Sequence, residues 1–135
     1  MKCVILLCVV VLVLTCASAK KHKDNKEISI KKAYKECQKN ETTHLDKQAL
    51  RKYKKKQVTT LPENYGEHVL CLYKVMGIIS EDGTINKDNL KKRIEKKAET
   101  EDNVDLILEE CGASQSDPKQ TAINLDTCLN KNKIH

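Results

Sequence analysis

Residues 67–77 read EHVLCLYKVMG, and this stretch has the apolar spacing of a helix with one buried face. Its apolar side chains recur at intervals of three and four residues, the period of an α-helix: Val69, Leu72, Tyr73 and Met76. Pro62, a few residues upstream, suits the first turn of such a helix. The stretch therefore predicts an amphipathic helix that carries one cysteine, Cys71.

The helical period continues on both sides of this stretch. The expected inner-face positions of the other helices are Ile30, Tyr34 and Cys37; Leu45, Ala49 and Tyr53; Leu90, Ile94 and Ala98; Val104, Ile107, Leu108 and Cys111; and Ala122, Leu125, Cys128 and Leu129. Polar residues separate these segments, with N-cap signals at Thr43 with Asp46 and at Asn86, a turn at 80–83, and Gly112 as a C-terminal cap. Only residues 27–30 alternate like a strand, and we assign them to the first helix. The pattern predicts an all-α protein of six helices.

The N-terminus has the features of a secretory signal peptide. Lys2 precedes an apolar run over residues 3–16, and Ala17-Ser18-Ala19 supplies the small residues of a cleavage site before Lys20. The run is shorter than the roughly 20 residues of a membrane span, and Thr15 fits a lipoprotein anchor on Cys16 poorly. We expect a signal peptide over 1–19, a charged disordered tail over 20–26, and a secreted, extracellular helical domain over 27–135.

The cysteine count then indicates disulfides. Removing residues 1–19 reduces seven cysteines to Cys37, Cys71, Cys111 and Cys128, an even number in a short secreted chain. Four cysteines make two bridges in one of three connectivities. A metal site is the rival interpretation, but no two of these cysteines are close in sequence, and the four histidines do not cluster near them. We therefore expect no bound metal.

Composition excludes several classes of function. The formal charge is +6 for the whole chain and +5 without Lys2, and only Arg51 and Arg93 are not lysines among the cationic residues from position 20 onward. Nucleic-acid binders also use arginine and aromatic stacking, and this chain has no Phe or Trp. The sequence contains no nucleophile elbow, no His-Glu-x-x-His and no Gly-rich phosphate loop. We expect neither an enzyme, nor a cofactor, nor a nucleic-acid partner.

The cysteine positions resemble those of the insect odorant-binding proteins of the PBP/GOBP type. That family has six cysteines, with three residues between the second and third and eight between the fifth and sixth. On this spacing the four cysteines correspond to the first, third, fourth and sixth, while Glu67 and Lys119 occupy the second and fifth positions. The joint loss of two partners resembles the branch called Minus-C. The stretches 71–77, 82–85 and 122–129 are similar to the family's sequences as well.

The resemblance implies the pairs Cys37–Cys71 and Cys111–Cys128 and a compact six-helix bundle around an apolar cavity. The aliphatic inner faces would otherwise indicate only an ordinary packed core. With a cavity, the candidate lining residues are Tyr53, Tyr73, Met76, Leu90, Ile94, Leu108 and Leu125, with tyrosine hydroxyls as orienting groups.

The function that this resemblance implies is a secreted carrier that reversibly binds small hydrophobic molecules, such as odorants, pheromones or fatty-acid-like ligands. A chemosensory receptor or a membrane surface is a further candidate partner. The alternative is a secreted salivary, venom or glandular effector that binds a host protein. A broad exposed apolar patch would favour the effector, and an enclosed cavity would favour the carrier.

Four local features complete the expectations. His68 is either a packed or surface histidine or a pH-sensitive group near a cavity mouth. Glu67 is expected to be solvated, and Asn40-Glu41-Thr42 is a glycosylation sequon. The tail 129–135 is expected to be too short and too polar to enter a cavity.

Overall fold

The computed structural model describes residues 28–134, and within them the chain forms six helices and no strand. The helices are α1 (Ile30–Cys37), α2 (Lys47–Lys54), α3 (Tyr65–Val75), α4 (Lys87–Glu95), α5 (Asp102–Cys111) and α6 (Pro118–Lys131). The predicted all-α class and the six helices are confirmed. The predicted signal peptide and charged tail lie outside the described residues. None of the described helices is both long and apolar enough to span a membrane.

Side-chain caps begin four of the helices. The Ser29 hydroxyl accepts a hydrogen bond from the Lys32 N–H at the start of α1. The side chains of Asp46, Asn86 and Asp117 each accept a hydrogen bond from a backbone N–H in the first turn of α2, α4 and α6. Pro118 then occupies the first turn of α6. The sequence predicted an N-cap at Thr43 with Asp46 three residues further on, but the N-cap of α2 is Asp46 itself. The Thr43 hydroxyl donates instead to the Cys37 carbonyl at 2.6 Å, at the end of α1.

Three helices end in a residue with positive φ. These residues are Lys56 after α2, Gly77 after α3 and Lys133 after α6, and the backbone hydrogen bonds around them close the last turn as Schellman motifs. Gly112 is the C-cap of α5, as the sequence predicted, and its φ of −86° lies outside the left-handed region. A Cβ atom there would lie 2.5 Å from the Leu108 carbonyl oxygen, so close approach explains the glycine.

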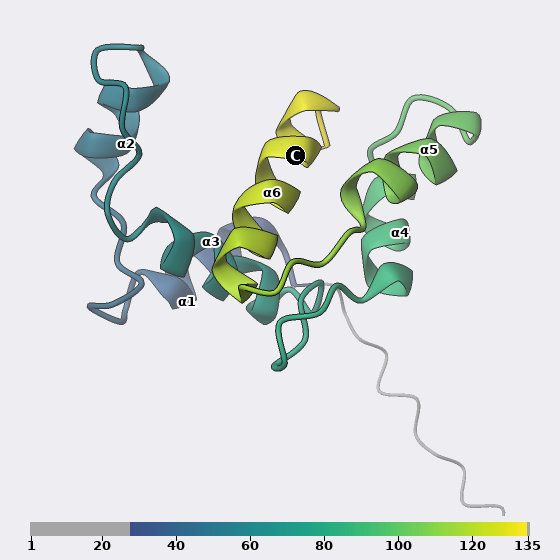
Figure 1. The fold of residues 1–135 in the computed structure, drawn as a ribbon, viewed down its shortest axis with the longest axis horizontal. Helices are drawn as coiled ribbons and strands as arrows, with labels where there is room; N and C mark the ends of the chain where they lie inside the picture. The colour runs from purple at the N-terminus through teal and green to yellow at the C-terminus, as the bar shows by residue number, and fades with distance from the viewer. Residues whose placement is uncertain (1–27, 135) are drawn as a thin grey trace, which may run out of the picture.

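Helix α3 lies at the centre of the helix contacts, since it packs against both α1 and α6 (Figure 1). Helices α4 and α5 pair with each other, and α5 also packs against α6. Helix α2 stands at the opposite end from α4 and α5, and among the described residues it packs closely against no other helix. The main core is therefore built between the α1, α3 and α6 group and the α4–α5 pair.

Two disulfides fix these contacts covalently. Cys37–Cys71 joins α1 to α3, and Cys111–Cys128 joins α5 to α6. These are the pairs that the resemblance implied. The bridged residues are 34 and 17 positions apart, so each bridge stabilises the fold by roughly 3–4 kcal/mol through the lost entropy of the unfolded chain.

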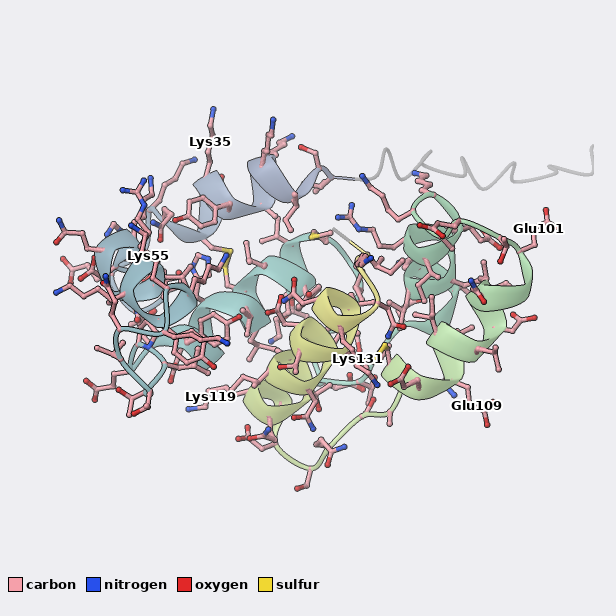
Figure 2. The ribbon with its side chains drawn as sticks, turned by 90° about the horizontal axis from the view of Figure 1, so that it is seen from above. Lys35, Lys55, Glu101, Glu109, Lys119 and Lys131 are labelled. Atoms are coloured by element: carbon pink, nitrogen blue, oxygen red, sulfur yellow. A yellow bond between two sulfur atoms is a disulfide. The ribbon has the colours of Figure 1, made fainter. Side chains whose placement is uncertain are left out.

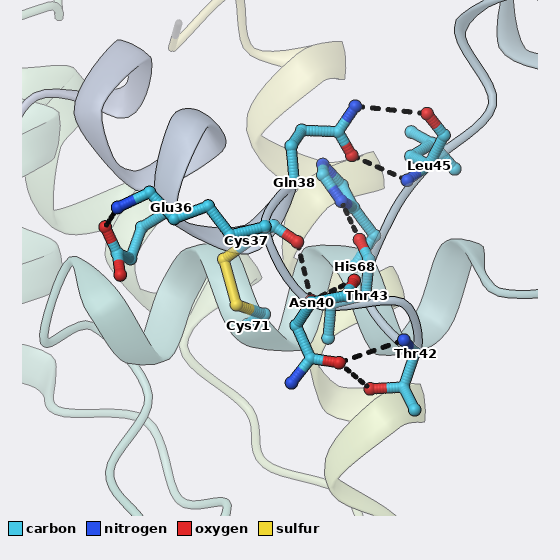
Figure 3. Close-up of a disulfide and its surroundings, with 10 residues drawn as sticks. Glu36, Cys37, Gln38, Asn40, Thr42, Thr43, Leu45, His68 and Cys71 are labelled. Atoms are coloured by element: carbon cyan, nitrogen blue, oxygen red, sulfur yellow. Dashed lines mark hydrogen bonds and ion pairs between the residues drawn. A yellow bond between two sulfur atoms is a disulfide. The ribbon is translucent and has the colours of Figure 1, made fainter.

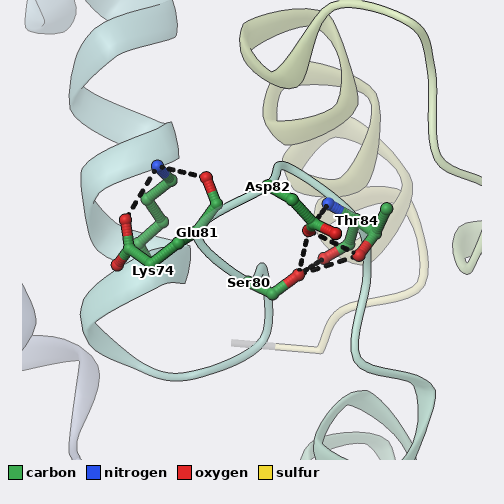
Figure 4. A network of polar contacts seen from close by, with 5 residues as sticks. All are labelled: Lys74, Ser80, Glu81, Asp82 and Thr84. Carbon is green, nitrogen blue, oxygen red and sulfur yellow. Dashed lines mark hydrogen bonds and ion pairs between the residues drawn. The ribbon is translucent and has the colours of Figure 1, made fainter.

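The turn after α3 is a compact polar network that lies against the start of α6 (Figure 4). The Asp82 carboxylate accepts hydrogen bonds from the Ser80 hydroxyl and from the backbone and side chain of Thr84, which lowers the pKa of Asp82 to about 2. Gly83 has a φ of +88°, as the turn prediction requires, and a Cβ atom there would lie 2.5 Å from Pro118. A side chain at this position would push the turn away from α6.

The sequence suggested that Glu67 is simply solvated, but its side chain forms an ion pair. Its carboxylate lies 3.0 Å from the Lys119 ammonium, and the hydrogen bond lowers the pKa of Glu67. The two residues lie on α3 and α6, and they are the two that stand at the second and fifth cysteine positions of the resemblance. An ion pair therefore joins the helices where the six-cysteine pattern would have a disulfide.

The C-terminal tail is packed more closely than its polarity suggested. Asn130, Lys131 and Lys133 are exposed, but Ile134 is only 4% exposed and belongs to the core. The reversal of the chain at Lys133 turns Ile134 back, and its N–H donates to the Leu129 carbonyl at 2.9 Å. Ile134 is thus a structural part of the fold.

We expect the double variant Glu67→Cys/Lys119→Cys to form a third disulfide on air oxidation and to gain about 3–4 kcal/mol of unfolding free energy. The reason is that the bridge closes a loop between residues 52 positions apart, whereas the exposed ion pair that it replaces contributes little to stability. Denaturant unfolding and intact mass measure the two effects. Glu67→Ser/Lys119→Ser is the control and should change stability little. Two free thiols in the oxidised cysteine variant would contradict this placement of α3 against α6.

We expect Ile134→Ala to lower the unfolding free energy by about 2 kcal/mol, because it removes a buried aliphatic side chain from the core. Thermal or urea unfolding measures the loss. Leu106→Ala is the matched control, since Leu106 is 66% exposed on α5 and its truncation should cost less than about 0.5 kcal/mol. Equal effects of the two substitutions would show that the tail is not docked.

Candidate ligand-binding site

Six of the seven predicted lining residues face a common interior. Tyr73, Met76, Leu90, Ile94 and Leu125 belong to the buried core, and Leu108 packs against it. They come from α3 and its C-cap, α4, α5 and α6. Leu90 and Ile94 have no exposed surface, and Leu125 is 1% exposed, so their side chains are closely packed. Their role as the lining of a cavity stays a prediction.

Tyr53 is the exception among the predicted residues. It lies half-buried on α2 and outside the core cluster. Its spacing from Leu45 and Ala49 predicted the helix correctly, but α2 packs against no other described helix. The structure therefore does not bring Tyr53 together with the interior residues.

A carboxylate within the α3–α6 contact holds two tyrosine hydroxyls. Tyr65 and Tyr73 on α3 donate to Asp126 on α6 at 2.6 and 2.9 Å, and Asn130 donates to the same carboxylate at 2.9 Å. Burial and the neighbouring carboxylate raise the pKa of Tyr65 and Tyr73 far above the usual value, so both keep their protons. Each tyrosine oxygen can still accept a hydrogen bond from a ligand, but its O–H is committed to Asp126.

The sequence did not indicate Tyr65 or Asp126 as site residues. The one signal was the position of Tyr65 two helical turns before Tyr73, on the same side of α3. Asp126 gave no signal, because an acidic residue next to Leu125 is typical of the solvated edge of an amphipathic helix.

An open pocket of about 840 Å³ lies elsewhere, between α1 and the segment that leads into α2. Its walls are Ile30, Lys31, Tyr34, Lys35, Gln38, His44, Leu45, Asp46 and Lys47. Leu45 is buried, but it lies outside the main core cluster. We name this concavity the α1–α2 pocket. None of the predicted lining residues belongs to it.

The Gln38 side chain fixes the shape of this pocket (Figure 3). Its amide accepts from the Leu45 N–H at 2.6 Å and donates to the Leu45 carbonyl at 3.1 Å, so both backbone groups of Leu45 are paired. The same amide nitrogen donates to the Tyr34 hydroxyl oxygen at 3.0 Å. One side chain thus connects the two opposite walls of the α1–α2 pocket.

His68 is a packed histidine that supports the same walls from α3. It is 1% exposed, and its Nδ1 lies 2.7 Å from the Thr43 carbonyl, which requires a proton on Nδ1 (Figure 3). Its Nε2 is buried with no hydrogen-bond partner, and its ring meets the Tyr34 ring edge to face at 5.1 Å. Burial lowers the pKa of His68, so the neutral form with Nδ1 protonated is favoured.

Two other candidate features are a sequon and a group of possible metal ligands. Asn40 is exposed in the α1–α2 connection, and its side-chain oxygen accepts hydrogen bonds from the Thr42 backbone N–H and hydroxyl. This sequon is accessible, and its glycosylation stays a prediction. Glu110, Cys111 and Cys128 lie close enough to hold a metal ion, but both sulfurs are in a disulfide and cannot act as thiolate ligands.

The chain is similar in sequence and in fold to known proteins. A model of the PBP/GOBP family matches residues 15–132. The B2 and B1 proteins of Tenebrio molitor are each 28% identical over 65 residues, which is 48% of this chain and 51% and 50% of theirs, so the chain spans about half the length of these curated relatives. Among solved structures, the fatty acid binding protein OBP56a from the oral disk of the blowfly Phormia regina gives a TM-score of 0.56 at 17% identity, covering 77% of this chain and 88% of its own. At that identity the likeness shows the fold alone.

We expect His68 to make the fold less stable as the pH falls below about 6.5. Because the pKa of His68 is lower in the folded protein than in the unfolded chain, the unfolded chain binds more protons in this range. The stability is therefore complete above pH 6.5 and is lost progressively toward the folded pKa. Carboxylates whose pKa is lowered by a lysine partner, such as Glu67 and Glu110, change the stability only at and below the usual carboxyl range of about 4 to 4.5.

The variant His68→Asn tests this effect, because its amide can still donate to the Thr43 carbonyl but does not titrate. Urea unfolding between pH 5 and 7 should show a flatter pH dependence than in the original protein. An unchanged slope in His68→Asn would rule out His68 as its source.

Proposed function

The chain belongs to the PBP/GOBP family, and we propose that it is a secreted carrier that reversibly binds small hydrophobic molecules. The ligands of this proposal are odorants, pheromones or fatty-acid-like molecules. It is supported by the family match and by the fold shared with a fatty acid binding protein. The observation that carries it is the apolar interior, to which α3, α4, α5 and α6 all contribute side chains.

The proposed binding mode is sequestration without chemistry. An aliphatic ligand that loses roughly 300 Å² of apolar surface to the interior gains about 7 kcal/mol, which corresponds to micromolar affinity. The proposed lining is Tyr73, Met76, Leu90, Ile94, Leu108 and Leu125. The hydroxyl of Tyr73 donates to Asp126 but can accept, so a ligand hydroxyl suits this interior better than a carbonyl or ester oxygen.

Ligand entry in this proposal requires the α4–α5 pair to move. The interior residues are packed, so a ligand must part α4 and α5 from α3 and α6. Among the described helices, α4 packs closely only against α5, and the pair is joined to α6 by the α5–α6 contact and the Cys111–Cys128 bridge. This bridge is the proposed pivot of the opening.

We also propose that the chain is a member of the Minus-C branch. The described residues contain four cysteines in two bridges, and Glu67 pairs with Lys119 at the two substituted positions. Secretion is proposed from the signal-peptide pattern of residues 1–19. A chemosensory receptor or a membrane surface remains a proposed partner.

No observation favours the alternative effector function. Among residues 28–134, the exposed large apolar side chains are Ile30, Val58 and Leu106, which lie on α1, after α2 and on α5. Such separate positions do not form the broad apolar patch that a protein-binding effector would present.

The test is binding of a fluorescent apolar probe to the purified protein. We expect saturable binding that aliphatic alcohols, esters and fatty acids displace, with alcohols stronger than esters of equal length. Leu108→Phe fills the interior and should lower the probe affinity at least several-fold. Leu106→Phe, the same change on the exposed side of the same helix, should leave the affinity unchanged.

Two results would contradict the proposal. Probe binding that neither saturates nor competes would leave only a packed core. Competitive binding that Leu108→Phe does not weaken would place the ligand outside the interior.

A further inference from the structure

The α1–α2 pocket has an apolar floor that lies apart from the interior. Ile30, Tyr34 and Leu45 line it, and Ile30 is 40% exposed although it is a large aliphatic residue. The volume of the pocket, about 840 Å³, is within the range of small-molecule sites. The pocket can therefore accept a hydrocarbon group without any movement of the α4–α5 pair.

The walls of this pocket are held rigidly before any ligand arrives. Gln38 connects Tyr34 to Leu45, and His68 supports the Tyr34 ring while it binds the Thr43 carbonyl. Cys37, the residue before Gln38, is joined to α3 by a disulfide. A ligand that binds here loses little free energy to ordering the protein.

Three lysines surround the apolar floor. Lys31 and Lys35 come from α1, and Lys47 begins α2, with its ammonium 5.6 Å from the centre of the Tyr34 ring. Within residues 28–134, none of the three has an ion-pair partner. The one acidic wall residue, Asp46, caps α2 by accepting from the Gln48 N–H at 2.8 Å. The pocket is thus apolar inside and cationic at its rim.

The charge of the surrounding surface has the same sign. Residues 47–60 contain six cationic side chains and no acidic one. Lys35 and Lys55 lie at this end of the molecule, while Glu101 and Glu109 lie at the opposite end (Figure 2). The uneven charge attracts an anion toward the α1–α2 end from a distance.

We propose that the α1–α2 pocket is a second binding site, for a small amphipathic organic anion whose hydrocarbon contacts Ile30 and Tyr34 and whose head group meets the lysines. The anionic head is a carboxylate, sulfate or phosphate. The Tyr34 hydroxyl oxygen accepts from Gln38, so its own O–H is available to donate to this head group. The site is independent of the interior of the proposed carrier function.

The shape of the site favours a dissolved anion over a membrane surface. Leu45, one of the apolar wall residues, is only 1% exposed, so its side chain cannot reach into a bilayer. A membrane-binding helix presents its apolar side chains outward, on a convex face. A single hydrocarbon chain, by contrast, can enter the pocket.

The experiment compares octyl sulfate with 1-octanol, which have the same hydrocarbon and differ in charge. Amide chemical shifts of the isotope-labelled protein locate each ligand, and titrations give the affinities. We expect octyl sulfate to shift residues 30–47 and to bind at least tenfold more weakly to Lys35→Glu/Lys47→Glu. Its binding should also weaken with added salt, whereas octanol binding should change in neither case.

Lys54→Glu/Lys55→Glu is the matched control, because it changes the net charge equally at exposed residues outside the pocket walls. It should lower octyl sulfate affinity less than threefold. An equal loss of octyl sulfate affinity in both variants would show that binding depends only on the net charge, and it would overturn the proposal. So would octyl sulfate shifts confined to the interior.

Vesicles containing phosphatidylserine distinguish the remaining source of an anionic head group. Binding to vesicles through Lys35 and Lys47, without binding of dissolved octyl sulfate, would overturn the proposal in favour of a membrane surface. If octanol fails to bind but octyl sulfate binds at residues 30–47, this site stands and the interior carrier site fails. The two proposals are therefore separable.

Discussion

The Asp126 carboxylate lies within the α3–α6 contact, and its hydrogen bonds to Tyr65 and Tyr73 fix how these helices meet. A half-buried carboxylate is costly without such donors, so the arrangement is stable only when both tyrosine hydroxyls point at it. The position of α3 in turn determines the positions of the segments attached to it. Cys71 attaches α1, and His68 holds the α1–α2 connection through Thr43. Both the interior and the α1–α2 pocket therefore depend on this contact.

Much of the fold could be predicted from local chemistry. Asn86 caps α4 and Asp46 caps α2, because a short polar side chain just before a helix can accept a hydrogen bond from an unpaired N–H of its first turn. Gly83 adopts the positive φ that its turn required. Such features depend on residues that are neighbours in sequence, so single-chain patterns contain enough information to predict them.

The rest depends on neighbours that are distant in sequence. Thr43 was expected to be a cap, but its hydroxyl donates a hydrogen bond to the Cys37 carbonyl instead. Glu67 was expected to be solvated, and its partner Lys119 lies on another helix. Ile134 follows a polar tail, and only the reversal at Lys133 brings it into the core. The α1–α2 pocket was not predicted, since its two walls are joined by Gln38 and Leu45, which do not belong to the same helix.

The ion pair between Glu67 and Lys119 changes how these positions can evolve. When one member of a disulfide is replaced, the other is left as a reactive thiol that can form mixed disulfides or cross-link two chains. Replacement of Glu67 or Lys119 leaves only an exposed charge, at little cost in stability. Single substitutions on the α3–α6 surface are consequently tolerated one at a time. This surface can diversify by ordinary point mutations while the two remaining bridges hold the fold.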